Sequence, residues 1–258
     1  MTAAARRSHG STVSLLDAVR PLPRRRGRLV VKCGGAVAKH AAADILDFVA
    51  EGHEVVVVHG AGPQISAEMT RRGLDVRFVE GRRVTSADAL EVVRESLLSV
   101  NAALCAAIGP SAVGLMGDAI GLAAVQVPKL GLVGDPLPCR PALVESALRQ
   151  RRIPVVAPLA KGPLNVNADE AAVALAAGLE AERILFVTDV PGVLIDGDVV
   201  SSIGADEAEH LIAEGAFEGG IVPKLQAASW AARLGIEAQI GETEILAVAR
   251  MSTSEVVA

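Results

Sequence analysis

The sequence predicts an α/β protein built on a mainly parallel sheet that helices cover on both faces. Short aliphatic runs alternate along the chain with longer segments of helical periodicity. The runs at 29–31 and 55–58 are continuously apolar, as expected of strands buried on both faces. About half of the 258 residues are hydrophobic but only 2% are aromatic, which predicts a core of Val, Leu, Ile and Ala. The length suits one large α/β domain or two small ones.

The first half of the chain begins with a short amphipathic helix at 12–20, which Pro21 and Pro23 stop. The elements expected after it are a strand at 28–33, a helix at 40–51, a strand at 54–59, a helix ending near 72, an extended hairpin at 76–84, a long helix at 86–108, and paired strands at 112–116 and 121–127. The helix at 40–51 has its apolar residues on one face, and the strand at 54–59 contains four consecutive valines.

The second half continues the alternation with a helix at 141–151, a strand at 153–157, an Ala-rich helix at 168–179, a strand at 184–188 and a long helix from 219 to 234. Asn167 is a favourable N-cap for the Ala-rich helix, and Asp169 then lies in its first turn, where a carboxylate complements the helix dipole.

Charge and cysteine content exclude several classes of protein. The net charge is −5, and residues 1–28 hold seven Arg and one Asp, so residues 29–258 carry −11. A general nucleic-acid surface is therefore not expected, and the basic leader is read as a solvated tail in preference to a nucleic-acid arm. Three widely spaced cysteines indicate reduced thiols in a cytoplasmic protein. The start lacks the apolar stretch of a signal peptide, and glycines interrupt 106–128, so no membrane span is expected.

Two predicted strands end in glycine-rich turns. Lys32 closes the first strand and is followed by Gly34 and Gly35, and the second strand runs into 59–63, His-Gly-Ala-Gly-Pro. The carboxyl ends of parallel strands meet at one edge of a sheet, and ligands bind there. Glycines let an anion approach the backbone N–H groups. Taken alone, however, the Lys32 segment is better explained as a strand end, a solvated lysine and an ordinary turn.

The motifs favour phosphoryl transfer over other chemistry. The chain has no Gly-x-x-x-x-Gly-Lys-Ser/Thr, no Gly-x-Gly-x-x-Gly after the first strand, and too few histidines for a credible Ser/His/Asp triad. It has two lysines beside glycines, three glycine-rich turns and an acidic helix start. Phosphoryl transfer needs positive charge, backbone donors and in-line positioning, and it needs no nucleophile on the enzyme.

Six segments together resemble the amino acid kinase family, in the order found in its members that phosphorylate acetylglutamate. They are Val-Lys-Cys-Gly-Gly at 31–35, His-Gly-Ala-Gly-Pro-Gln-Ile at 59–65, Glu-Gly-Arg-Arg-Val-Thr at 80–85, Leu-Asn-Val-Asn-Ala-Asp-Glu-Ala-Ala at 164–172, Val-Thr-Asp-Val-Pro-Gly-Val-Leu at 187–194 and Gly-Gly-Ile-Val-Pro-Lys-Leu at 219–225. The resemblance implies an open three-layer αβα sandwich at 27–250 that follows an N-terminal extension at 1–26. Its N-terminal lobe (27–165) would bind the amino acid, and its C-terminal lobe (166–250) would bind ATP.

The resemblance also implies roles for individual residues. The catalytic set would be Lys32 on the transferred phosphoryl group, Lys224 on the nucleotide side, and Asp169, which orients both lysines. The substrate-binding set would be Gly60, Ala61, Gly62, Arg83 and Asn165, and the nucleotide- and phosphate-binding set would be Gly34, Gly35, Asp189, Gly219 and Gly220. Magnesium would be held through the ATP phosphates and by no protein ligand. Taken singly, each role has a plain structural rival, such as a helix-start carboxylate for Asp169 or a solvated pair for Arg82 and Arg83.

The implied reaction is ATP-dependent phosphorylation of the side-chain carboxylate of N-acetyl-L-glutamate to an acyl phosphate, in arginine biosynthesis. The alternatives are another N-blocked acidic amino acid, such as carrier-bound aminoadipate or glutamate, and a non-catalytic ligand sensor. The resemblance implies a cytoplasmic homodimer, or a hexamer joined through the helix at 12–20. Two departures from the family pattern could lower the activity. Ala61 replaces the middle glycine of a three-glycine turn, and the loop before Asn165 is short.

Overall fold

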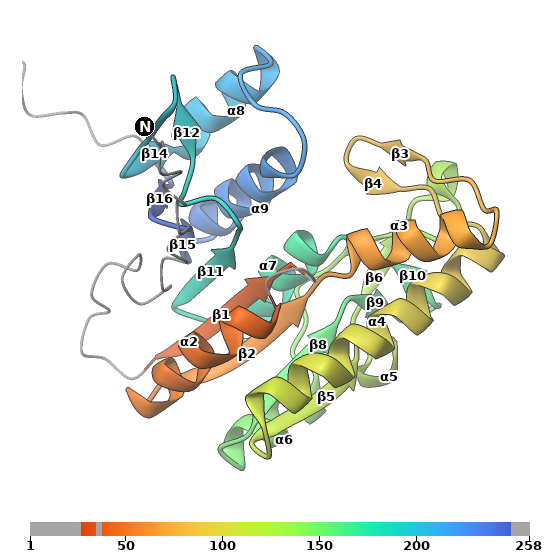
Figure 1. The fold of residues 1–258 in the computed structure, drawn as a ribbon. Coiled ribbons are helices and arrows are strands. Elements are labelled where there is room, and N and C mark those ends of the chain that lie inside the picture. Colours follow the sequence, from red (N-terminus) through yellow and green to blue (C-terminus); the bar gives the residue numbers. More distant parts are fainter. Residues whose placement is uncertain (1–26, 35–37, 249–258) are drawn as a thin grey trace, which may run out of the picture.

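The computed structural model describes residues 27–34 and 38–248 (Figure 1). The helix expected at 12–20 and Gly35 lie outside the described residues. One eight-stranded sheet organises the described chain, in the order β14-β16-β15-β11-β1-β2-β8-β5. Its strands are β1 (Arg28–Cys33), β2 (Glu54–His59), β5 (Ala112–Met116), β8 (Ile153–Ala157), β11 (Arg183–Val187), β14 (Ser202–Gly204), β15 (Glu237–Ile240) and β16 (Thr243–Leu246). All neighbouring pairs are parallel except β15 with β16, which confirms the mainly parallel sheet.

Helices cover both faces of the sheet, as the continuous apolar strands predicted. Alternate residues of β1 enter two different cores, because successive side chains of a strand point to opposite faces. Val30 packs in a core with α6 (Ala142–Arg149), α7 (Ala168–Gly178) and α9 (Ile221–Arg233). Leu29 and Val31 pack in a second core with α2 (Ala38–Ala50) and α4 (Ala87–Ile108). The described chain is therefore the three-layer αβα sandwich that the resemblance implied.

Smaller elements surround the central sheet. A third core joins α3 (Gly62–Arg71) to α4. The remaining helices are α5 (Gly117–Ile120), α8 (Ala205–Ala213) and the 3₁₀ turn η1 (Pro128–Leu130). The described residues also form four two-stranded ribbons: β3 (Phe78–Val79) with β4 (Arg82–Arg83), β6 (Ala124–Gln126) with β7 (Gly134–Pro136), β9 (Leu159–Ala160) with β10 (Leu164–Asn165), and β12 (Leu194–Ile195) with β13 (Asp198–Val199). None of the helices in the described part of the chain is long and apolar enough to cross a membrane.

The prediction of two paired strands at 112–116 and 121–127 is wrong in part. β5 pairs with β8 at the edge of the main sheet, while β6 pairs with β7 in a separate ribbon. The short helix α5 lies between them and ends at Gly121, whose φ of +80° turns the chain away. Alternating glycine and aliphatic residues look alike in an edge strand and in a ribbon, so the local pattern could not separate the two.

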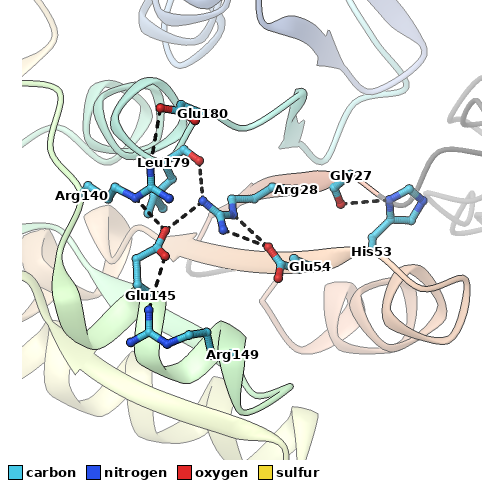
Figure 2. A network of polar contacts seen from close by, with 9 residues as sticks. All are labelled: Gly27, Arg28, His53, Glu54, Arg140, Glu145, Arg149, Leu179 and Glu180. Carbon is cyan, nitrogen blue, oxygen red and sulfur yellow. Dashed lines mark hydrogen bonds and ion pairs between the residues drawn. The ribbon is translucent and has the colours of Figure 1, made fainter.

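Charged side chains gather at the amino-terminal ends of β1 and β2 (Figure 2). The Arg28 guanidinium bonds to Glu54 at 2.9 Å, to Glu145 of α6 at 3.0 Å, and to the carbonyl of Leu179 at the end of α7. Arg140 donates to the same Glu145 oxygen at 3.0 Å. The network ties β1 to β2, α6 and α7 at the end of the sheet that carries none of the predicted site residues.

Candidate active site

The candidate site lies at the carboxyl ends of three neighbouring parallel strands. β1 lies between β2 and β11, with Lys32 opposite Val58 on one side and Phe186 on the other. The segments that leave these strands carry Gly34, Gly60 and Asp189, so the fold brings together motifs that are more than 150 residues apart in sequence. This confirms the expectation that the glycine turns after the first two strands open on the same edge.

A buried ion pair lies at the centre of this edge. Lys32 is on the same face of β1 as Val30, which directs it toward α7, and its Nζ lies 2.7 Å from Oδ1 of Asp169. The two side chains are only 6% and 8% exposed. Asn167 caps α7 by accepting hydrogen bonds from the N–H groups of Asp169 and Glu170, at 2.8 and 3.3 Å. The cap fixes the first helical turn, so the Asp169 carboxylate reaches Lys32 from a rigid position.

The turn after β2 does not carry the strain that the Ala61 replacement suggested. Ala61 has φ −141° and ψ 26°, a conformation open to any residue, and its methyl group is buried in the core beneath α3. The N–H of Gly60 already donates to the Cys33 carbonyl at 2.9 Å. A Cβ atom built on Gly62 would meet nothing within 4 Å. The open side of the turn is therefore at Gly62, and alanine is tolerated in the middle.

His59 and Asn101, which the sequence reasoning missed, support this turn from below. His59 is fully buried, and burial lowers its pKa to about 4, so the ring is neutral. Its Nε2 lies 3.0 Å from Nδ2 of Asn101, which also donates to the Val155 carbonyl at 2.9 Å. Because the amide nitrogen of Asn101 can only donate, Nε2 of His59 must accept, and the proton of the neutral ring is on Nδ1. The signal available for Asn101 was an amide in the otherwise apolar stretch 100–108 at the end of the long α4 helix.

Arg83 is a buried cation that has no carboxylate partner among the described residues. Its Nη2 donates to the Gly62 carbonyl at 3.1 Å and to the Ser66 hydroxyl at 2.7 Å. The ring of Phe78 lies over the guanidinium, with its centroid 4.6 Å from Cζ. Burial lowers the pKa of Arg83 from its ordinary value. A carboxylate entering here would restore the missing counter-charge, and the planar guanidinium can bind it with two hydrogen bonds.

Asn165, on β10, is linked to the backbone of Arg83 through Thr85. Its Nδ2 donates to the hydroxyl of Thr85 at 3.0 Å, and that hydroxyl donates to the carbonyl of Arg83 at 2.8 Å. The chain of hydrogen bonds fixes the position of the amide relative to the guanidinium. The short loop before Asn165 therefore still delivers this residue to the site.

Lys224 approaches from α9, on the other side of the ion pair. Its Nζ donates to the Gly220 carbonyl at 3.0 Å, one turn earlier. Burial lowers the pKa of Lys224, while Asp169 raises it and Lys32 lowers it, so the two lysines and the aspartate share one electrostatic environment. Gly219 has φ +67°, which glycine alone adopts without cost, and α9 consequently starts at Ile221 and not at 219 as predicted.

One cavity of about 420 Å³ collects most of the predicted residues. It is lined by Lys32, Gly34, Gly60, Ala61, Gly62, Arg83, Asn165, Asp169, Asp189, Gly220 and Lys224. Gly219 is not part of the lining. Phe78 and Arg82 also line the cavity, although the sequence reasoning gave them no role in the site. The cavity joins a guanidinium that has no carboxylate partner among the described residues, a buried Lys–Asp pair and a second lysine. This set suits an acidic small molecule and a phosphate ester side by side.

Cys33 follows Lys32 but faces away from the cavity. Its side chain packs in the core beneath α2 and α4, and burial raises its pKa to about 12. The described residues contain no group of three or more His, Cys, Asp or Glu side chains that could hold a metal ion.

The sequence of residues 27–242 matches the family model described as the amino acid kinase family. The chain belongs to the amino acid kinase family. The match covers both sides of the cavity, from β1 to the strand that follows α9.

Curated members of this family are similar over most of the chain. An acetylglutamate kinase of Roseiflexus castenholzii is 40% identical over 229 residues, covering 83% of this chain and 88% of its own. An acetylglutamate kinase of Rubrobacter xylanophilus is 42% identical over 221 residues, covering 82% and 87%.

Solved structures agree with the amino acid kinase fold. The smu.665 protein of Streptococcus mutans superposes with a TM-score of 0.78 at 30% identity, covering 86% of this chain and all of that one. An N-acetylglutamate synthase of Neisseria gonorrhoeae, 22% identical, has a TM-score of 0.74 over 89% of this chain and 61% of its own. At 22% identity, the similarity to the N-acetylglutamate synthase indicates a shared fold only.

Proposed function

We propose that this amino acid kinase transfers the γ-phosphoryl group of ATP to the side-chain carboxylate of N-acetyl-L-glutamate, a step of arginine biosynthesis. One observation carries the proposal: Arg83, a buried guanidinium with no carboxylate partner in the part of the chain that the structure describes, opens on the same cavity as the Lys32–Asp169 pair. The similarity to acetylglutamate kinases over more than four-fifths of the chain supports this substrate over other acids.

The chemistry assigned to the chain is positioning and charge stabilisation. Arg83 and Asn165 hold the α-carboxylate and the acetylated nitrogen, so that the side-chain carboxylate points at the ATP γ-phosphorus. A carboxylate oxygen forms the new P–O bond while the bond to the ADP oxygen breaks, and the products are an acyl phosphate and ADP. During the transfer, negative charge moves from the attacking carboxylate toward the leaving oxygen of ADP. Lys32 and Lys224 stabilise this charge from two sides. The N–H groups of Ala61 and Gly62, which line the cavity, would bind phosphoryl oxygens.

The two lobes divide the substrates in this proposal. Residues 27–165 would hold the amino acid, and 166–250, as far as they are described, would hold ATP through Lys224, Gly219, Gly220 and Asp189. ATP use follows from membership of a kinase family, and Mg²⁺ is the proposed counter-ion. The cavity offers Asp169 and Asp189 but no cage of carboxylates, so the donor set fits a cation that enters on the ATP phosphates. When bound, this ion neutralises phosphate charge.

We also propose that the protein forms a homodimer. The edge strand β5 is only half-buried although it is mostly apolar, which supports a homodimer formed across this edge. A hexamer would require the helix expected at 12–20, which lies outside the described residues. We further propose that the protein works in the cytoplasm.

The decisive experiment measures ADP release from MgATP in the presence of N-acetylglutamate and traps the acyl phosphate with hydroxylamine as a hydroxamate. A panel of N-acylated aspartate, glutamate and aminoadipate, free and attached to a carrier protein, tests the substrate alternatives. We expect N-acetylglutamate to give the largest kcat/KM. Turnover with another member of the panel alone would reassign the substrate, and absence of turnover with all of them would favour a ligand sensor.

A further inference from the structure

Two adjacent arginines of β4 make entirely different contacts. Successive side chains on a strand point to opposite sides. Arg83 reaches the α3 turn and has no carboxylate partner in the described chain, whereas Arg82 bonds to two carboxylates. The difference suggests that Arg83 is kept for a ligand and Arg82 for holding the strand itself.

Arg82 joins the β3–β4 hairpin to two other elements of the site. Its Nε and Nη2 donate to Oε1 of Glu170, at 3.2 and 2.9 Å, and its Nη1 donates to Oδ1 of Asp135 on β7. Glu170 is in the first turn of α7, directly after Asp169. The guanidinium therefore connects the strand that carries Arg83 to the helix that carries the catalytic aspartate.

The hairpin needs such a connection because it is not part of the central sheet. β3 and β4 pair only with each other, and Figure 1 shows the ribbon projecting beyond α3. In the described part of the chain its other ion pair, Glu80 with Lys129 at 3.8 Å, is largely exposed and contributes little. The bond from Asn165 to Thr85 fixes the base of the hairpin and not its tip.

We propose that Arg82 is a positioning residue that, through Glu170, fixes the hairpin against the first turn of α7 and so sets the separation between the Arg83 carboxylate anchor and the Lys32–Asp169 pair. This inference rests on the proposed function. The distance between anchor and phosphoryl site selects an acid whose side-chain carboxylate reaches the phosphorus when its α-carboxylate lies on Arg83. A misplacement of about 1 Å can reduce catalysis by about 10².

Glu170 gives Arg82 a second effect. Burial raises the pKa of Glu170, and its Oε2 is buried without a hydrogen-bond partner in the described structure. The adjacent guanidinium supplies the counter-charge. Without Arg82, Glu170 would lose this counter-charge, and burial would favour its protonated, neutral form.

A double-mutant cycle of Arg82→Met and Glu170→Met tests the connection. Each change alone removes the same link, so we expect the KM for N-acetylglutamate to rise about tenfold in both, with the KM for ATP within about twofold. The double variant should show no further rise, because the link is already broken. Arg82→Lys should rescue part of the effect, since an ammonium can pair with Glu170 but cannot also reach Asp135.

Two results would overturn the inference. If Arg82 contacted the substrate directly, Glu170→Met would leave the KM unchanged or lower it, and the effects would not be shared. If Arg82→Met left the KM unchanged, the hairpin would be held by other contacts. The matched control is Arg233→Met, because Arg233 also bonds two carboxylates, Asp206 and Glu209, on α8. This change should leave the KM for N-acetylglutamate unaltered.

A measurement without catalysis separates this inference from the proposed reaction. Amide hydrogen exchange of residues 78–84 should become faster in Arg82→Met and Glu170→Met but not in Arg233→Met. If the wild-type protein phosphorylates none of the acids tested but exchange still accelerates, the link is real and the proposed reaction fails. If the wild type is active and exchange and KM are both unchanged, only the role of Arg82 fails.

Discussion

Strand β1 carries a cation at each end, and the two cations have very different surroundings. Arg28, at the amino end, bonds to two carboxylates and to a helix-terminal carbonyl (Figure 2). Lys32, at the carboxyl end, has one ion-pair partner among the described residues, Asp169, and lies against the cavity. Both cations reach the same helix, α7, one at its last turn and the other at its first.

The geometry of β1 and α7 explains this arrangement. From Arg28 to Lys32 the strand spans about 13 Å, and from Leu179 back to Asp169 the helix spans about 15 Å. The antiparallel helix therefore presents its C-terminal carbonyls to Arg28 and its first-turn carboxylate to Lys32, which complements the helix dipole at both ends. At Arg28 the polar groups satisfy each other and the result is stability. At Lys32 the ion pair lies against a cavity, where a ligand can reach it.

The largest expected effect comes from breaking the carboxyl-end pair. Lys32→Ala should lower kcat by about 10²–10³, because it removes a donor to the migrating phosphoryl group. The KM for N-acetylglutamate should change little. ADP release under saturating substrates measures the effect, with Lys161→Ala, an exposed lysine outside the cavity, as the control. An unchanged kcat would show that Lys32, like Arg28 at the amino end of β1, has only a structural role.

Asp169 sharpens the same test. Asp169→Asn keeps the shape of the side chain and removes the charge 2.7 Å from Lys32. The double variant Lys32→Ala, Asp169→Asn should lose much less activity than the product of the two single losses, because residues that act as a unit are not additive. Multiplicative losses would show that Asp169 acts only as a helix-start carboxylate.

The next effect concerns stability against acid at the site end of β2. His59 has a folded pKa of about 4, below its ordinary value of 6.5, because burial disfavours the charged ring. The unfolded chain therefore binds the proton more readily, and stability present above pH 6.5 is lost as the pH falls toward 4. The loss amounts to about 3 kcal/mol. Urea unfolding between pH 7 and 4 should show a steeper decline than in His59→Gln, and parallel curves would contradict this assignment.

Breaking the Arg28 network at the amino end of β1 should lower stability and leave catalysis nearly unchanged. Arg28→Met should lower the free energy of unfolding by about 2 kcal/mol, since it removes charge-assisted hydrogen bonds from a side chain that is only 15% exposed. The kcat should stay within about twofold of the wild type. Denaturant unfolding and the ADP assay measure the two quantities on one preparation. A large fall in kcat with unchanged stability would show that Arg28 does not have the purely stabilising role assigned to it.

The smallest effect tests the substrate anchor. Arg83→Lys keeps the charge but loses the planar pair of donors, so the KM for N-acetylglutamate should rise about tenfold while the KM for ATP stays constant. The matched control is Arg77→Lys, an exposed arginine just before the same hairpin. Equal KM values for wild type and Arg83→Lys would move the carboxylate site elsewhere.

The sequence predicted the parts of this fold whose patterns are local. The valine run of 54–59 and the Asn167 cap of α7 appear where expected, because burial on both faces and helix capping leave direct signatures. The resemblance placed Lys32, Asp169, Arg83 and Lys224 in one site, and the topology brings them to one cavity.

Other features could not be predicted because they depend on contacts that are distant in sequence. Arg82 meets Glu170 across 88 residues, and nothing near either residue indicates the pairing. The harmless conformation of Ala61 follows from how the turn leaves β2, which a comparison of residue types cannot reveal. His59 and Asn101 required knowledge that α4 crosses beneath that turn.

The burial of Cys33 has a consequence for how the protein can be probed and inhibited. Its thiol is the sulfur nearest in sequence to Lys32, yet it faces the opposite side of the sheet with a pKa of about 12. Alkylating reagents react with thiolates, which are almost absent here at neutral pH. Electrophilic warheads aimed at this cysteine would therefore label the folded kinase slowly, and mild oxidants would leave its active-site strand intact.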